Sequence, residues 1–335
     1  MPLKKPNIKD VADKAGVAQS TVSRVINNSE KVSEETYSKV KNAIKKLGYK
    51  PNVLARSMRT GKTSTIAVLL PDLKNLFFSE LIGSIELAAG KRDYRVFICN
   101  SNEDSNRERV LMKDLLNRNV DGIILSSVSG SENLEIIQEL KQKIPLIVVD
   151  RKIKGLNINT VAVDDHKGIY NATNYFIEKG HNNIAYVSGP LNKQIHETRL
   201  RGYTDALKDS GFQKQNDLII EENFRATGGS NAVKKILSLN KKVTSIVFSN
   251  DMMAIGAIRA LKSKGVKIPE EIELMGFDNI PLAQLIFPSL STVAQPIKEI
   301  GLEAVKLLFS KMEEPSLHAR EILLKTTFKF RETTK

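Results

Sequence analysis

The sequence predicts an N-terminal all-α head followed by a larger two-lobed α/β body with parallel sheets. Three short helical patterns, each with one apolar face, occupy residues 8–47. From residue 64 onward, short apolar runs alternate with helical stretches, from STIAVLL at 64–70 to EIELMGF at 271–277. This alternation indicates βαβ units and parallel strands. A chain of 335 residues is also long enough for more than one domain.

Positive charge is concentrated in the head. Residues 1–63 hold 14 Lys or Arg and 5 Asp or Glu, a net charge of +9 out of +13 for the whole chain. A strongly basic head on a nearly balanced body indicates nucleic acid or an anionic membrane as partner.

The sequence has no apolar run of about 18 residues and no signal-like N-terminus, so no membrane span is expected. The single cysteine, Cys99, excludes an intrachain disulfide and favours a cytoplasmic location.

The three helices of the head have recognisable ends. The first helix has Asn7 as its N-cap and ends at Gly16, the second lies within 19–28, and the third follows Ser33 and ends at Gly48. Three short helices with a glycine in the first turn are typical of a helix-turn-helix, whose second helix enters the major groove of DNA.

The motifs DVADKAGV, STVSRV and LGYKPN closely resemble the headpiece of the LacI/GalR transcription regulators. The resemblance extends over nearly the whole chain and implies a dimeric repressor that binds double-stranded operator DNA. It implies that Gln19 and Ser20 read bases and that Arg24 contacts guanine, in keeping with the bidentate pairings of these side chains. Ala18 stands where the family often has Ser, so a cap worth about 1 kcal/mol is missing at that position, and either the helix start is looser or capping shifts to Ser20. The DNA-binding residues expected are Gln19, Ser20, Thr21, Ser23, Arg24, Asn27, Leu54, Ala55, Arg56 and Met58.

The segment NVLARSM, residues 52–58, is far shorter than the roughly 12–15 residues that an isolated helix needs to be stable. By resemblance it is the hinge helix, which forms on DNA and lies in the minor groove. Met58 stands at the position of the apolar wedge between base pairs, and Arg56 can reach phosphates.

The body is expected to resemble the periplasmic-binding-protein fold of the same regulators. In that fold the chain crosses between the lobes three times, here near residues 163, 291 and 322, with Asp164 and Asp165 in the first crossing turn. The expected organisation is a helix-turn-helix domain at 1–50, a hinge at 51–61, a first lobe at 62–163 with 291–322, and a second lobe at 164–290 with 323–335.

Polar and aromatic residues follow the predicted strands, where ligands bind in open α/β sheets. Carboxylates, amides and Arg suit sugar hydroxyls, which both donate and accept hydrogen bonds. Taken singly, each position could equally be a helix cap or part of the core. Together, NLFF, VDR, TRLRG, GFD and AQP resemble ribose-binding proteins and ribose operon repressors, which implies ribose as effector. The ligand-binding residues expected are Asn75, Phe77, Phe78, Ser127, Asp150, Arg151, Arg199, Phe224, Asn250, Asp278 and Gln295, with Ser127 standing where the transport relatives have Asn.

Two other functions have some support in the sequence. The GKT at 61–63 matches the end of a phosphate-binding loop, but that motif needs Gly where Arg56 stands. No GxGxxG opens a helix, and the histidines and the cysteine are scattered without metal-ligand spacing, so we expect no enzyme, cofactor or metal site. The rival within the family is a catabolite control protein, which responds to a phosphorylated carrier protein docked on the body.

The sequence leaves open whether the effector is ribose, another pentose or a phosphorylated derivative, and whether it releases or strengthens DNA binding. The C-terminus has no heptad tail, which favours a homodimer over a tetramer.

Overall fold

The computed structural model describes every residue except 1–5, 27–31, 50–60, 129–131, 191–193 and 214. The chain forms two compact units, Met1–Thr63 and Ser64–Lys335, which are described separately. Among the residues with described positions, no helix is both long enough and apolar enough to cross a bilayer.

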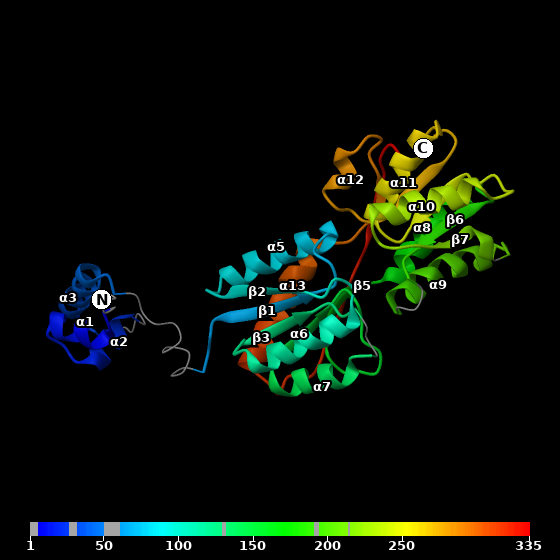
Figure 1. The fold of residues 1–335 in the computed structure, drawn as a ribbon. Helices are drawn as coiled ribbons and strands as arrows, with labels where there is room; N and C mark the ends of the chain where they lie inside the picture. The colour runs from blue at the N-terminus through cyan, green and yellow to red at the C-terminus, as the bar shows by residue number, and fades with distance from the viewer. Residues whose placement is uncertain (1–5, 27–31, 50–60, 129–131, 191–193, 214) are drawn as a thin grey trace. The chain divides into compact units, whose positions relative to one another are not determined.

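The head is a three-helix unit (Figure 1), with α1 at Ile8–Ala15, α2 at Gln19–Ile26 and α3 at Glu34–Leu47. Asn7 and Asp10 form a capping box, in which the Asn7 Oδ1 accepts from the backbone of Asp10 and the Asp10 Oδ2 accepts from the backbone N of Asn7. Gly16 and Gly48 end α1 and α3 in the left-handed conformation that glycine adopts without strain. The helices meet over a small core of Val11, Ala12, Val22, Val25, Val40 and Ala43.

The first lobe is a parallel sheet with the strand order β11-β5-β4-β3-β1-β2. Its strands are β1 Thr65–Leu70, β2 Arg95–Asn100, β3 Gly122–Leu125, β4 Leu146–Val149, β5 Asn159–Val163 and β11 Glu321–Leu324. Helices α5 (Leu76–Gly90) and α13 (Ile297–Glu313) pack together on the face that carries Ile66 and Val68. Helices α6 (Ser105–Asn117) and α7 (Leu134–Lys143) cover the opposite face. Both faces of the sheet are therefore buried, which explains why its central strands are apolar throughout.

The second lobe has the strand order β12-β10-β9-β8-β6-β7, and its only antiparallel pair among the described strands is β10 with β12. Its strands are β6 Ile184–Ser188, β7 Ile219–Glu221, β8 Ser245–Phe248, β9 Glu273–Asp278, β10 Ser291–Ala294 and β12 Thr327–Lys329. Its helices are α8 Asp165–Glu178, α9 Gln194–Asp209, the 3-10 turn η1 Asn216–Leu218, α10 Ala226–Leu237, α11 Asp251–Ser263 and α12 Leu282–Leu285. Helix α8 packs on α9, and α10 packs on α11.

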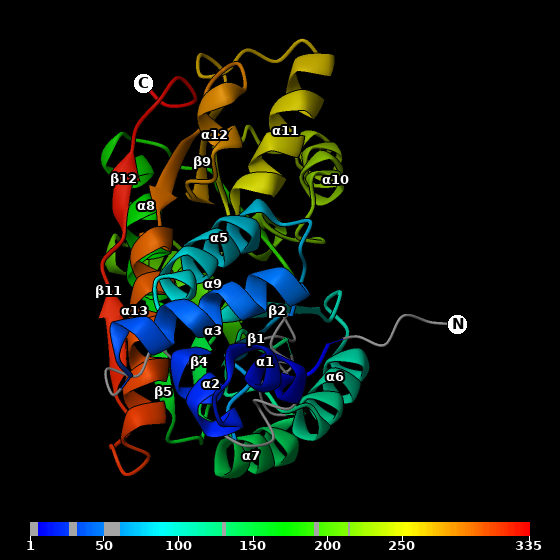
Figure 2. The ribbon, with the colours of Figure 1, turned by 90° about the vertical axis from the view of Figure 1, so that its left-hand side faces the viewer.

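The chain passes between the lobes three times, and two of these crossings come later than the sequence suggested. The first lies between β5 and α8. The second follows β10, because β10 pairs with β9 in the second sheet, so the expected position near 291 was wrong. The third follows β11, because β11 pairs with β5 in the first sheet through Leu324, so residues 323 and 324 belong to the first lobe. Figure 2 shows β11 and β12 following one another along one side of the body, one in each lobe. Sheet membership depends on long-range pairing, which the short runs STVA and EILL do not reveal.

Candidate functional site

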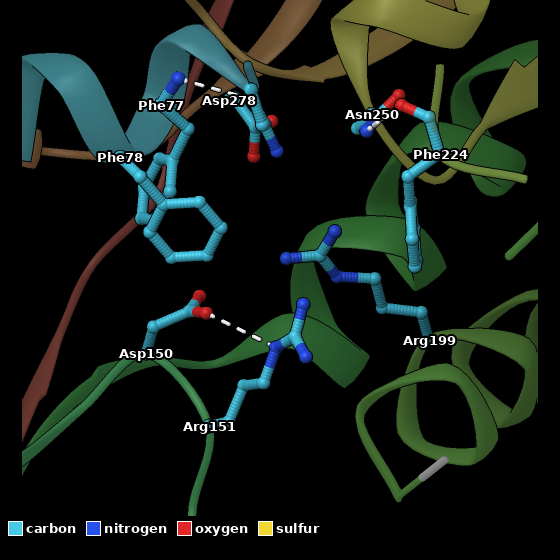
Figure 3. A pocket seen from close by; sticks show the side chains of 9 residues that line it. Phe77, Phe78, Asp150, Arg151, Arg199, Phe224, Asn250 and Asp278 are labelled. Atoms are coloured by element: carbon cyan, nitrogen blue, oxygen red, sulfur yellow. Dashed lines mark hydrogen bonds and ion pairs between the residues drawn. The ribbon is translucent and has the colours of Figure 1, made fainter. Parts of the chain in front are cut away.

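A cavity lies between the two lobes of the body, and both lobes supply its walls (Figure 3). It is lined by Asn75, Phe77, Phe78, Asp150 and Arg151 of the first lobe and by Arg199, Phe224, Asn250 and Asp278 of the second. In Figure 3, Phe78 and Asp150 face Arg199 and Phe224 across the cavity. The structure thus brings together nine of the eleven residues singled out from the sequence as ligand-binding.

Two of the lining residues are also helix caps. The Asn75 Oδ1 accepts from the backbone N of Phe77 at 3.1 Å and begins α5. The Asn250 Oδ1 accepts from the backbone N of Met253 at 2.8 Å and begins α11, while its Nδ2 donates to the Phe224 carbonyl at 3.0 Å. The caps fix both amides at the cavity wall.

Arg199 is the cationic residue that the second lobe contributes to the cavity. Its Nε and Nη2 both lie 2.7 Å from Oδ1 of Asp165, and its Nη1 donates to the Ser249 carbonyl at 2.5 Å. The guanidinium carbon also lies 4.0 Å from the centre of the Phe277 ring. Because these partners hold the guanidinium plane in one orientation, Arg199 presents fixed donors at the cavity.

Arg151 is the matching cation of the first lobe. Its Nη2 donates to Oε1 of Glu103 at 2.9 Å, its Nη1 donates to Oε2 at 3.3 Å, and its Nε lies 3.5 Å from Oδ2 of Asp150. Each cleft arginine is therefore neutralised by a carboxylate, so the cavity combines both charges without a large excess of either.

Burial raises the pKa of the cleft carboxyls. The pKa of Asp165 rises to about 6, with burial as the largest cause and Arg199 acting in the opposite sense. Burial likewise raises the pKa of Asp150, against the lowering effects of Arg151 and Arg199, and that of Asp278, against the lowering effect of Arg199. A carboxyl whose proton is retained more readily can donate as well as accept, which matches the hydrogen-bonding character of a hydroxyl group.

Asp150 and Asp278 also have unusual backbones. Asp150 has φ +64° and Asp278 has φ +121°, in regions that residues with a Cβ rarely adopt. Such strain is found where a function requires one side-chain direction. Asp150 directly follows the buried strand β4, and Asp278 is the last residue of the buried strand β9. The backbone turn at each position directs the carboxyl group towards the cleft.

Two expected ligand residues do not line the cavity. Ser127 is buried and its Oγ donates to Glu108 at 3.1 Å inside the first lobe, whereas its neighbour Ser126 contacts Asp150. Gln295 reaches the site indirectly, because its Nε2 donates to Oδ1 of Asp278 at 2.8 Å. Its buried Oε1 has no hydrogen-bond partner within the described part of the chain.

The second helix of the head presents the residues expected to read DNA. Gln19, Ser20 and Arg24 are exposed, Thr21 and Ser23 are half-buried, and the apolar residues of α2 face the head's core. This division leaves a polar outer face on the helix. The other residues expected at DNA lie outside the described residues, namely Asn27, Leu54, Ala55, Arg56 and Met58.

Two sequence profiles match the chain in the same two parts. Residues 7–52 match the bacterial regulatory proteins of the lacI family, and residues 63–332 match the periplasmic binding proteins and sugar binding domain of the LacI family. The chain belongs to the LacI family. It is a transcriptional regulator with a DNA-binding headpiece and a sugar-binding domain, and the expected family and fold class are confirmed.

Several relatives of this LacI-family protein match it nearly end to end. Catabolite control protein A of Priestia megaterium is 36% identical, covering 98% of this chain and 99% of its own. The ribose operon repressor of Haemophilus influenzae is 33% identical, covering 97% and 98%. The lac repressor dimer bound to operator and the anti-inducer ONPF superposes with a TM-score of 0.88 at 25% identity, covering 99% of both chains. A LacI family regulator of Enterococcus faecium with bound ribose gives a TM-score of 0.73 at 32% identity, covering 81% and 98%.

Sequence reasoning missed three residues that hold this LacI-family site together: Asp165, Glu103 and Gly189. Asp165 was interpreted as part of a crossing turn, although it anchors Arg199. Gly189 follows β6, and a Cβ at this position would lie 2.1 Å from the Phe224 ring. Only a glycine allows the ring to lie this close to the backbone. The sole signal in the sequence was a glycine directly after a strand, in SGP.

Proposed function

We propose that the protein is a homodimeric repressor that acts in the cytoplasm on operator DNA and is controlled by a small neutral sugar, with ribose the first candidate. The observation that carries this proposal is the cavity in which aromatic, amide, carboxyl and guanidinium groups of both lobes converge. The ribose operon repressor among the relatives and the ribose-bound regulator among the similar structures support ribose.

The charges at the cleft favour an uncharged ligand over a phosphorylated one. Arg151 is paired with Glu103, and Arg199 is paired with Asp165. A phosphate group would need cations that are not already neutralised, and it would meet Asp150 and Asp278 at the same wall. Hydroxyl groups instead use both the donors and the acceptors, while Phe77, Phe78 and Phe224 offer apolar surface to the C–H faces of the ring.

The proposed mechanism follows from where the ligand would lie. A sugar in contact with both lobes stabilises their closed arrangement, and it controls DNA binding only through its different affinity for the open and closed states. In a dimer, the two headpieces read two half-sites, so a change in the body can alter the match to their spacing. We expect ribose to weaken operator binding.

Calorimetry with D-ribose, D-xylose, L-arabinose and ribose 5-phosphate tests the effector, and an operator gel shift with the best ligand tests the direction of control. Ribose should release heat and weaken the operator complex. Absence of heat with ribose would remove it as effector, and tighter operator binding with ribose would reverse the proposed sign.

A catabolite control function is the second candidate, favoured by the 36% identity with catabolite control protein A. In this function the regulator responds to a phosphorylated carrier protein that docks on the body. A phosphoserine carrier protein that tightens the operator complex without any sugar would favour this candidate over the first.

A further inference from the structure

The mouth of the cleft carries a charge pair that joins the two lobes. Nη2 of Arg225, which directly precedes α10 in the second lobe, lies 3.2 Å from Oδ2 of Asp72, which follows β1 in the first lobe. The Asp72 side chain is only 8% exposed, and its other oxygen accepts from the backbone N of Lys74 at 3.0 Å. Asp72 is therefore fixed in the first lobe, and Arg225 reaches to it from the second.

Arg225 is the neighbour of Phe224, which forms a wall of the effector cavity. A second cavity at the cleft mouth includes Asp72 and Arg225 in its lining and shares Asn75 and Phe224 with the effector cavity. The two residues Phe224 and Arg225 thus form one short segment that contacts the ligand cavity on one side and the opposite lobe on the other.

This segment is held rigidly on the second lobe. Oδ1 of Asn223 accepts from the backbone N of Arg225 at 3.0 Å, and the Phe224 carbonyl accepts from Asn250 at 3.0 Å. A Cβ on Gly228 in α10 would lie 2.0 Å from the Asn223 carbonyl oxygen, so the segment lies tightly against the helix. These contacts fix the backbone of residues 223–225 on the second lobe. A movement of Arg225 therefore also moves Phe224 and the rest of that lobe.

We propose that Asp72 and Arg225 are a positioning pair of the effector site, whose ion pair across the cleft mouth holds the lobes closed with Phe224 against the sugar. This inference rests on the proposed sugar-binding function. The apparent affinity of a ligand falls in proportion to the fraction of protein in the binding-competent state, so the pair strengthens sugar binding without touching the sugar.

The chain offers a matched control for this pair. Lys154 of the first lobe and Glu197 of the second also pair across the cleft, at 3.5 Å, but their side chains are 73% and 62% exposed. Exposed ion pairs of this kind contribute little. The Arg225 side chain is 52% exposed, so the two pairs differ mainly in their carboxylates, 8% exposed in Asp72 and 62% in Glu197, while both join the same two lobes.

Calorimetry with D-ribose on the full chain provides the first test. Asp72→Asn and Arg225→Gln should each weaken binding about threefold to tenfold, and the double variant should be no weaker than the weaker single variant, because one interaction is removed in all three. The difference in ribose affinity between the wild type and Arg225→Gln should become smaller as the salt concentration rises from about 0.05 to about 0.5 M. Lys154→Gln and Glu197→Gln should stay within about twofold of the wild type. Additive losses, or equal losses in the control pair, would overturn the proposal.

A distance measurement tests the pair without any sugar. Spin labels on Glu80→Cys in α5 and Lys234→Cys in α10 report lobe separation, since both positions are exposed and lie on different lobes. The native Cys99 is buried, and burial raises its thiol pKa to about 11, so it should not react with the label. Arg225→Gln should shift the population towards longer distances, and Lys154→Gln should not.

The two measurements separate the two proposals. Wild-type protein that binds no sugar, together with a longer distance in Arg225→Gln, would refute the sugar effector and the role of the pair in sugar binding, and would leave only its role in holding the lobes closed. Tight ribose binding in every variant with unchanged distances would refute the pair and leave the effector standing.

Discussion

Arg199 and Asp165 are joined by two nitrogen atoms on one oxygen: Nε and Nη2 of the arginine both lie 2.7 Å from Oδ1 of the aspartate. Both side chains are almost fully buried, and they connect α9 to the start of α8. The pair therefore links the cavity wall to the first crossing between the lobes.

Arg199→Ala should abolish measurable sugar binding, because it removes the fixed cation of the second lobe. It should also lower the free energy of unfolding by about 3–5 kcal/mol, because Asp165 is left buried without its partner. Calorimetry and urea unfolding measure the two effects. Arg201→Ala, an exposed position on the same helix, is the control and should change neither. Ribose affinity within twofold of wild type in Arg199→Ala would show that Arg199 is not a ligand residue.

Gly189→Ala should weaken sugar binding about tenfold, because the new Cβ would lie 2.1 Å from the Phe224 ring and displace it into the cavity. Overpacking of this kind typically costs about 1–3 kcal/mol. Gly83→Ala in α5 is the matched control, since a Cβ there meets nothing within 4 Å. In a Phe224→Ala background, Gly189→Ala should cause little further loss of affinity. A second tenfold loss in that background would rule out displacement of the ring as the cause.

The stability of the body should decrease as the pH rises from about 5 to about 8, as far as its buried acids contribute. Burial raises the pKa of Asp165 from 3.8 to about 6 and that of Asp251 to about 7, so the folded state binds these protons more tightly than the unfolded state. The resulting stabilisation is complete below about pH 4 and is lost as the pH passes through these raised values. Melting curves across this range should show a shallower decrease for Asp165→Asn than for the wild type. Parallel curves for the two proteins would contradict the raised pKa of Asp165.

Arg24→Ala should weaken operator binding by at least tenfold, because a bidentate arginine–guanine contact is worth about 1–3 kcal/mol of discrimination. Sugar binding to the body should not change. Lys14→Ala, an exposed position on α1, serves as the comparison and should weaken binding to operator and random DNA alike. If Arg24→Ala lowers both affinities equally, Arg24 contacts phosphate and not a base.

Local patterns were enough to predict the head. Asn7 and Gly16 bound the first helix as expected, because caps and apolar periodicity are properties of neighbouring residues. The strands β1 to β6, β8 and β9 were recognisable for the same reason, whereas the three-residue strands β7 and β12 were too short to show a pattern.

The site was only partly predictable. Residues such as Asn75 and Asp150 follow strands and match family motifs, so sequence reasoning found them. Glu103 and Asp165 act through partners 48 and 34 positions away, and no local pattern reports such pairs. Ser126 and Ser127 both follow β3 directly, but the Ser126 hydroxyl contacts Asp150 at the cleft and the Ser127 hydroxyl contacts Glu108 in the interior, a difference that no sequence pattern reports.

The strands that complete one edge of each lobe follow all the other strands of their sheets in the chain, so they leave the ribosome after them. β11 completes the first sheet and β12 completes the second, and the fully buried Thr333 donates to the Leu274 carbonyl and accepts from the backbone N of Ser291. The head, with its own core, is synthesised before the body. A premature stop codon before residue 321 would therefore release a chain with a finished head and two unfinished lobes.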